Sequence, residues 1–110
     1  MRRGNTPTHT FTAPFDILPD TAVRIVYAQN DRVVLERTTE SCTIDGNKII
    51  VDLSQEETLL FDTEPHYEGG KYQPYPVEIQ VGIRTAGGKV AWSDIITDTV
   101  ERILRKDGVV

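Results

Sequence analysis

The sequence is poor in the residues that build disulfide frameworks and metal sites. Its 110 residues include one cysteine and two histidines. An intramolecular disulfide needs two cysteines, and a structural zinc site needs several cysteine or histidine ligands at set spacings. The composition therefore excludes a small domain held together by disulfides, and it predicts no bound metal.

Long hydrophobic runs and an excess of basic residues are also missing. A membrane-spanning helix needs about 20 apolar residues, and the sequence contains no run of that kind. Arg2 and Arg3 are followed by polar residues, so the start of the chain does not predict a secretory signal. A net charge of −5 disfavours binding to a phosphate backbone. We expect a protein that binds neither nucleic acid nor membranes and that folds in a reducing cytoplasm.

The residue types that catalyse reactions form no recognised combination. Cys42 lies in an alternating stretch, where a free cysteine is most often buried and unreactive. Nothing in the spacing of His9 and His66 brings them together, and the acidic residues at 62–68 lack the pattern of a calcium-binding loop. The glycine pairs lack the lysine and hydroxyl residue of a phosphate-binding loop. We therefore expect no catalytic residues and no cofactor, and hence no enzyme.

What the sequence does contain is a repeated period of two. In residues 77–83, valine and isoleucine alternate with polar residues and glycine, which is typical of a strand with one buried face. Trp92 is expected on the inward face of the following strand, and the adjacent Ile95 and Ile96 predict a β-bulge at residues 93–95. The same period predicts one strand and three hairpins, at residues 8–14, 21–38, 41–54 and 76–95.

Two segments interrupt this period. Ser54 followed by Glu57 is the pattern of a capping box, so we expect a short helix to begin there. Residues 62–76 contain three prolines, a glycine pair and three tyrosines, and tyrosine is enriched at protein interfaces. We predict an interaction loop here, and the alternative is that its rings cover the core. The tyrosines of this loop are Tyr67, Tyr72 and Tyr75.

About seven short strands at intervals of about ten residues, with one short helical crossover, indicate an all-β fold. We predict an antiparallel immunoglobulin-like β-sandwich, with a small β-barrel as the alternative. Residues 1–7 are expected to form a flexible N-terminal arm, and residues 8–110 a single β-sandwich domain. The last part, residues 98–110, either continues a strand through Val100 or turns briefly helical.

Three stretches of the chain resemble a family of small phage and prophage proteins from Gram-positive gut bacteria. They are PTHTFTAPFD at residues 7–16, CTIDGNKIIVDLSQEETLLF at 42–61 and AWSDIITDTVERILRKDGVV at 91–110. The resemblance covers most of the chain, and its first stretch and the closing KDGVV are the most specific parts. Members of this family pass more directly from the helix to the strand PVEIQV, so the resemblance implies that the segment HYEGGKYQPYP is an expansion in this chain.

The resemblance implies a structural protein of the virion, in its head or tail, that contacts other virion proteins and itself. Such a protein is made and assembled in the cytoplasm of the bacterial host. The resemblance brings no catalytic residues to this chain. The alternative is a carbohydrate- or receptor-binding module of a phage tail that uses the tyrosines of residues 62–76, and an enzyme inhibitor is a third reading that the residues leave open.

Overall fold

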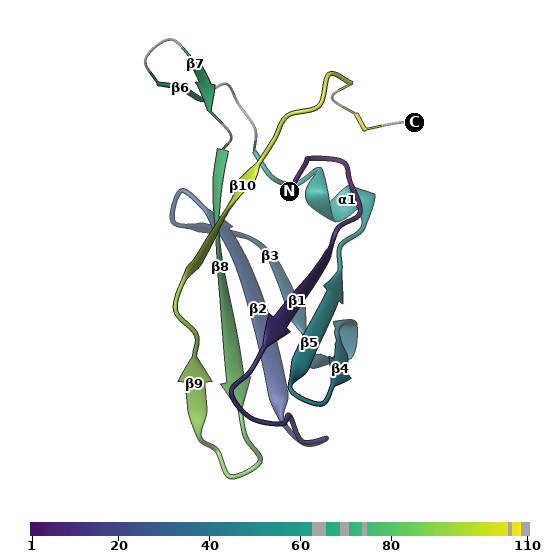
Figure 1. Ribbon diagram of the computed structural model, residues 1–110, viewed down its shortest axis with the longest axis vertical. Coiled ribbons are helices and arrows are strands. Elements are labelled where there is room, and N and C mark those ends of the chain that lie inside the picture. The colour runs from purple at the N-terminus through teal and green to yellow at the C-terminus, as the bar shows by residue number, and fades with distance from the viewer. Residues whose placement is uncertain (63–65, 69–70, 74, 106, 109–110) are drawn as a thin grey trace.

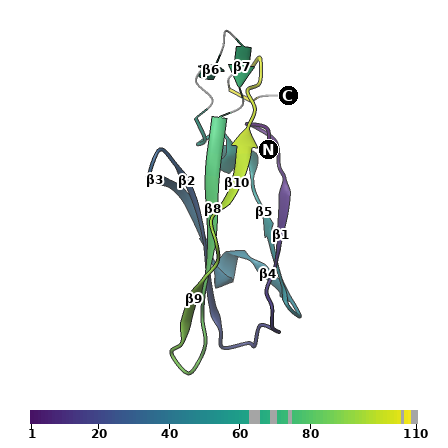
Figure 2. The same cartoon turned by 60° about the vertical axis from the view of Figure 1, so that its left-hand side comes forward.

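Two antiparallel sheets make up the body of the protein. The computed structural model describes residues 1–62, 66–68, 71–73, 75–105 and 107–108, and the side chains of these residues except those of 66–68 and 71–73. The first sheet has the strand order β1–β5–β4, with β1 at Thr8–Thr12, β5 at Lys48–Asp52 and β4 at Thr43–Asp45. The views in Figures 1 and 2 show this sheet facing the second one.

The second sheet has the order β10–β8–β2–β3, and β9 also pairs with β8. Its strands are β2 (Ala22–Gln29), β3 (Arg32–Thr38), β8 (Tyr75–Arg84), β9 (Val90–Trp92) and β10 (Ile96–Val100). Because β2 pairs with one side of β8, β9 and β10 both lie on its other side. The segment after residue 95 is therefore a strand through Val100, which was one of the two expected structures.

The strand order is that of an immunoglobulin-like sandwich. The chain passes from β1 to the β2–β3 hairpin in the other sheet, returns for β4 and β5, and crosses again to β8. Immunoglobulin domains place strands B, E and D in one sheet and strands G, F, C and C′ in the other. Here β1, β5 and β4 correspond to strands B, E and D. The edge formed by β9 and β10 corresponds to strand G, and β8, β2 and β3 correspond to strands F, C and C′. The predicted fold class is therefore confirmed.

Short helical segments connect the two sheets. The 3₁₀ helix η1 (Thr39–Ser41) lies between β3 and β4, and helix α1 (Gln55–Thr58) follows β5. The predicted capping box is present, because Glu57 N–H donates to Ser54 Oγ at 3.1 Å and Ser54 N–H donates to Glu57 Oε1 at 2.9 Å. These bonds satisfy two donors that a helix start otherwise leaves unpaired, so the helix begins where the sequence predicted.

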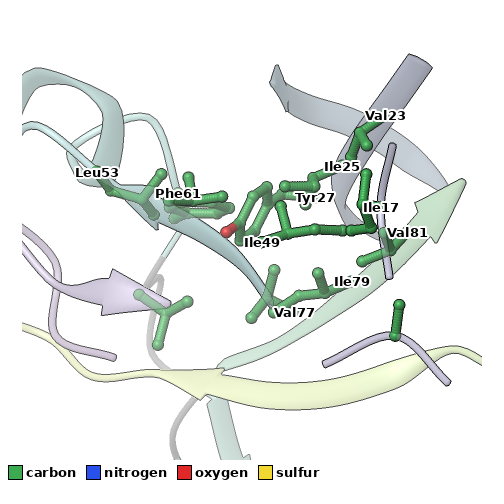
Figure 3. Packing of buried hydrophobic residues seen from close by; sticks show 13 residues of the cluster. Ile17, Val23, Ile25, Tyr27, Ile49, Leu53, Phe61, Val77, Ile79 and Val81 are labelled. Carbon is green, nitrogen blue, oxygen red and sulfur yellow. The ribbon is translucent and has the colours of Figure 1, made fainter. Parts of the chain in front are cut away.

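The core lies between the two sheets and is formed by alternate residues of their strands. Tyr27 and Phe61 are almost fully buried in its middle, with their rings edge to face and the centroids 5.8 Å apart, as Figure 3 shows. Because β2 and β8 alternate in burial, one face of each is removed from water. The buried hydrophobic residues are Ala13, Ile17, Val23, Ile25, Tyr27, Ile49, Val51, Leu53, Phe61, Val77, Ile79, Val81 and Val100.

One polar pair is built into this core. The ring of His9 stacks on that of Tyr27, with centroids 5.8 Å apart, and His9 Nδ1 lies 2.8 Å from Tyr27 Oη in a hydrogen bond. Burial lowers the pKa of His9 and raises the pKa of Tyr27 above its ordinary value. Both side chains are therefore kept neutral at neutral pH, and the pair joins β1 of one sheet to β2 of the other.

Candidate interaction edge

The outer edge of the second sheet is built from β9 and β10 together. Trp92 of β9 pairs with Gly82 of β8, and Ile96 of β10 pairs with Ile79. The edge therefore advances by four residues, from Trp92 to Ile96, while β8 advances by three, from Gly82 to Ile79. The extra residue forms the β-bulge that was predicted at residues 93–95. We call β9, this bulge and β10 the open edge, because in the part of the chain that the structure describes no strand pairs with the far side of β9.

The backbone of β9 presents hydrogen-bonding groups on its free side. The N–H of Ser93 donates to Val81 O at 2.8 Å. Because successive residues of a paired strand direct their backbone groups to opposite sides, the N–H and C=O groups of Trp92 and Val90 point away from β8. A row of such groups is a template for an added strand.

The open edge also exposes large apolar side chains. Val90 is 59% exposed, Trp92 52%, Ile95 57% and Ile96 42%. Natural sheets protect a free edge with charged residues, prolines, a covering segment, short strands or bulges, and of these the open edge has a short β9 and a bulge that contains the exposed Asp94. Exposed apolar groups on a free edge, by contrast, mark a surface that associates.

Trp92 is not a core residue, so the prediction from the sequence was wrong. Pairing of Ala91 with Ile83 directs Ala91 toward the core side, and Trp92 then lies with Gly82 on the outer face of the sheet. The five residues at 85–89 fix this register. A Cβ on Gly82 would lie 2.6 Å from the Trp92 ring, so the missing side chain of Gly82 lets the ring rest against the sheet.

A groove of about 380 Å³ separates the open edge from β1, the edge strand of the first sheet. We call it the side groove. None of the residues that line it is charged. It is lined by residues 10–15 on one side, by residues 91–93 and Ile96 on the other, and by Ile49, Val81 and Ile83.

A second hollow lies on the outer face of the second sheet, and Trp92 borders both spaces. This hollow has a volume of about 420 Å³ and is lined in part by Arg24, Glu40 and Arg84. The two hollows therefore differ in chemistry, because the outer one carries charge of both signs and the side groove carries none.

The first three residues of the chain lie along the continuation of β10. Arg2 and Glu101 form a parallel bridge. The Met1 amine donates to Thr99 O at 2.9 Å, and Arg3 N–H donates to Glu101 O at 3.0 Å. The start of the expected flexible arm thus has strand-like partners in the fold, which its composition does not reveal.

The predicted interaction loop, residues 62–76, contains a hairpin that was not predicted from the sequence. Strands β6 (His66–Glu68) and β7 (Lys71–Gln73) pair with Tyr67 opposite Tyr72, and they lie beyond the end of the sandwich, at the top of Figure 1. Tyr75 begins β8, is half-buried, and accepts a hydrogen bond from Asn30 Nδ2. The side chains of Tyr67 and Tyr72 lie outside the described residues, so the interaction role of this loop stays a prediction.

One buried glutamine holds both ends of this loop. Gln29 is 5% exposed. Its Nε2 donates to Asp62 O at 3.1 Å and to Pro76 O at 3.4 Å, and its Oε1 accepts from Asp62 N–H at 2.7 Å. Asp62, which precedes the hairpin, and Pro76, which follows it, are therefore both anchored to β2 through Gln29.

The other ionisable groups that the sequence singled out have structural partners. Cys42 packs half-buried against the core, and burial raises the pKa of its thiol. Arg37 Nη1 donates to both carboxylate oxygens of Glu57, at 2.7 and 2.9 Å. Burial acts to raise the pKa of Glu57, but the Ser54 N–H and the Arg37 guanidinium outweigh it and lower that pKa. The ion pair between Arg37 and Glu57 therefore links β3 to α1.

The described residues contain neither a cluster of metal-ligating side chains nor a membrane-spanning helix. No three histidine, cysteine, aspartate or glutamate side chains among them are placed to hold a metal ion. No helix in the same part of the chain is long and apolar enough to cross a membrane. His9 lies in β1 and His66 in β6, and these two strands do not pair.

Comparison with known proteins adds one distant likeness. No family model matches the chain, and no curated protein matches it. Among solved structures, the V domain of amphioxus IgVJ-C2 is similar, with a TM-score of 0.34 and 15% sequence identity over 91% of this chain and 96% of that one. The immunoglobulin-like assignment rests on the strand order of the two sheets.

Proposed function

We propose that this protein is a non-enzymatic interaction domain that contacts other proteins through the open edge. The observation that carries the proposal is the row of exposed apolar side chains from Val90 to Ile96, on an edge whose β9 part has no partner strand among the described residues. Covering apolar surface is favourable by about 25 cal/mol per Å², and an added strand pairs the free backbone groups. Both terms favour contact with another polypeptide.

The chemistry of the ionisable groups supports a non-enzymatic role. Catalytic groups need a free nucleophile, acid or base in a concave site. Here the thiol of Cys42 has a raised pKa, His9 and Tyr27 bond to each other in the core, and Glu57 is bonded to Arg37. Immunoglobulin-like sandwiches commonly serve as binding and cell-surface modules.

We further propose that the partners are proteins of a phage particle and that the chain is carried in the head or tail of the virion after assembly in the host cytoplasm. This part of the proposal rests on the resemblance of residues 7–16, 42–61 and 91–110 to small phage and prophage proteins. Apart from its first residue, Val90, the open edge falls within the third of these stretches. A structural protein of a particle acts through its contacts, which is the role that an apolar edge serves.

The test of the open edge is photo-crosslinking from two matched valines. A photoreactive phenylalanine analogue replaces Val90 on the open edge or Val33 on β3, the opposite edge of the same sheet, where the exposures are 59% and 54%. Each variant is expressed in a lysogen during prophage induction. We expect the Val90 variant to crosslink to one defined protein and the Val33 variant to none. Equal capture at both positions would remove the open edge from the proposal.

The phage role has its own test. Particles from the induced lysogen are purified on a density gradient, and the chain is followed by immunoblot. We expect it to migrate with the particles and to stay with them through a second gradient. A chain found only in the soluble fraction would refute the virion role and leave the interaction domain to be tested on its own.

A further inference from the structure

We propose that the side groove binds an extended, uncharged segment of a partner protein, which lies along β9 as an added strand. This inference rests on the proposed function and specifies the chemistry of the partner. Three features of the described residues support it: the lining of the groove, the free side of β9, and the course of the N-terminal residues.

The lining selects a segment without charge. The chain carries 12 basic and 17 acidic residues, yet the groove is lined by none of them. Its base includes Ile49 and Val81, which are 1% and 6% exposed. A charged side chain that faced this base would lose its hydration and gain no partner, which is costly. An apolar side chain in the same place would gain contact with the core.

The geometry of a strand then sets the pattern of the segment. Successive side chains of a strand point to opposite sides. A segment paired with the free groups of Val90 and Trp92 therefore directs every second side chain toward the groove. The intervening side chains point outward, to solvent or to the rest of the partner. The expected pattern is an apolar residue at every second position, separated by small polar residues.

The chain itself already uses the adjoining part of this edge for strand pairing. Met1 to Arg3 run parallel to the continuation of β10, with Arg2 bridged to Glu101. Met1 also packs partly buried against the core. A peptide added before Met1 in the same direction would run along β10 and reach β9 beside the side groove. The edge therefore accepts a parallel strand at one end, and the groove lies along the rest of its length.

A partner segment fits this edge better than a second copy of the chain. β9 has three residues and is followed by the bulge. Short edge strands and bulges are features that limit pairing between the whole edges of two sheets. A single flexible segment can follow the bend, whereas a rigid sheet edge of another copy cannot.

The experiment extends the N-terminus of the full chain by about eight residues that alternate threonine with valine or isoleucine, enough to span the open edge at about 3.3 Å per residue. The control extension has the same composition with its apolar residues grouped together. Two readouts are used: the Tm, and the quenching by acrylamide of Trp92, which is the sole tryptophan of the chain. A tethered segment tests the groove at high effective concentration.

We expect the alternating extension to raise the Tm by about 5 °C and to reduce the quenching of Trp92 relative to the grouped extension. The gain should be lost in Ile96→Lys, because Ile96 lines the groove. It should be kept in Ile95→Lys, because Ile95 lies on the outer face, by a small hollow shared with Val26 and Ala28. Each variant is compared with its own unextended form, so a general loss of stability cancels.

Equal Tm and equal quenching for the two extensions would overturn the inference, and so would a gain that survives Ile96→Lys. If the unextended chain forms dimers in light scattering and Trp92 is shielded only in the dimer, the occupant is a second copy and the partner segment is wrong. Neither a failed extension test nor a dimer changes the result expected from crosslinking at Val90, because that experiment tests the proposed function without reference to the groove.

Discussion

Replacing Gln29 with leucine should loosen the link between the sandwich and residues 62–76. Leucine fills much of the same space, so the change removes hydrogen bonds and leaves little cavity. The two shorter bonds, to Asp62 O at 3.1 Å and from Asp62 N–H at 2.7 Å, lie within the usual range for amide groups. The third, to Pro76 O at 3.4 Å, is weaker.

At about 1 kcal/mol for each of the two shorter bonds, Gln29→Leu should lower the free energy of unfolding by about 2 kcal/mol. For a domain of this size that corresponds to a fall in Tm of roughly 10 °C. Urea unfolding followed by Trp92 fluorescence measures the change, and hydrogen exchange should show faster exchange at Asp62 N–H, the donor that loses its bond to Gln29 Oε1.

The matched control is Gln80→Leu. Gln80 Nε2 donates to Ser93 O at 2.9 Å on the exposed side of the sheet, where water can replace the bond, so we expect a change of no more than about 0.5 kcal/mol. A free energy of unfolding for Gln29→Leu within about 0.5 kcal/mol of the wild type would show that Gln29 does not anchor the loop.

Three further predictions concern pH, an ion pair and the tyrosines. Because burial lowers the pKa of His9 below its ordinary 6.5, the unfolded chain binds the proton more readily than the folded one. The free energy of unfolding should therefore be highest above about pH 6.5 and fall as the pH decreases below it. Urea unfolding at several pH values should show a smaller fall in His9→Gln than in the wild type. Arg37→Met should cost about 1–3 kcal/mol, because both side chains of its pair with Glu57 are less than a quarter exposed, whereas Arg24→Met, at a pair more than 40% exposed on both sides, should cost at most about 1 kcal/mol; equal losses would contradict this. A glycan array should give no binding, and a hit that is lost when the tyrosines of residues 62–76 are replaced would favour the carbohydrate-binding alternative.

Local patterns in the sequence were sufficient for much of the fold. Alternation predicted the hairpins, the pair Ser54 and Glu57 predicted the start of α1, and the adjacency of Ile95 and Ile96 predicted the bulge. Each of these signals comes from residues that are neighbours in the chain, so the physical cause is present in a short stretch of sequence. The antiparallel sandwich then follows from the number and spacing of such strands.

The parts that were missed depend on register and on distant contacts. Trp92 was assigned to the core because the alternation of the hairpin was expected to resume with it on the inward face, but pairing across the turn at 85–89 places it on the outer face. The β6–β7 hairpin had a local signal in Gly69-Gly70, since a glycine pair between two short segments is typical of a tight turn. The side groove had none, because it forms between the edges of two different sheets.

If the open edge is the contact surface of this protein, a bound partner should cover Trp92. The most direct measurement is acrylamide quenching of Trp92 in the free chain and in the purified complex with the protein that crosslinks to Val90, with the Trp92 signal isolated by selective labelling. We expect Trp92 to be readily quenched in the free chain, because it is 52% exposed, and to be shielded in the complex. A complex in which Trp92 is quenched as readily as in the free chain would contradict this.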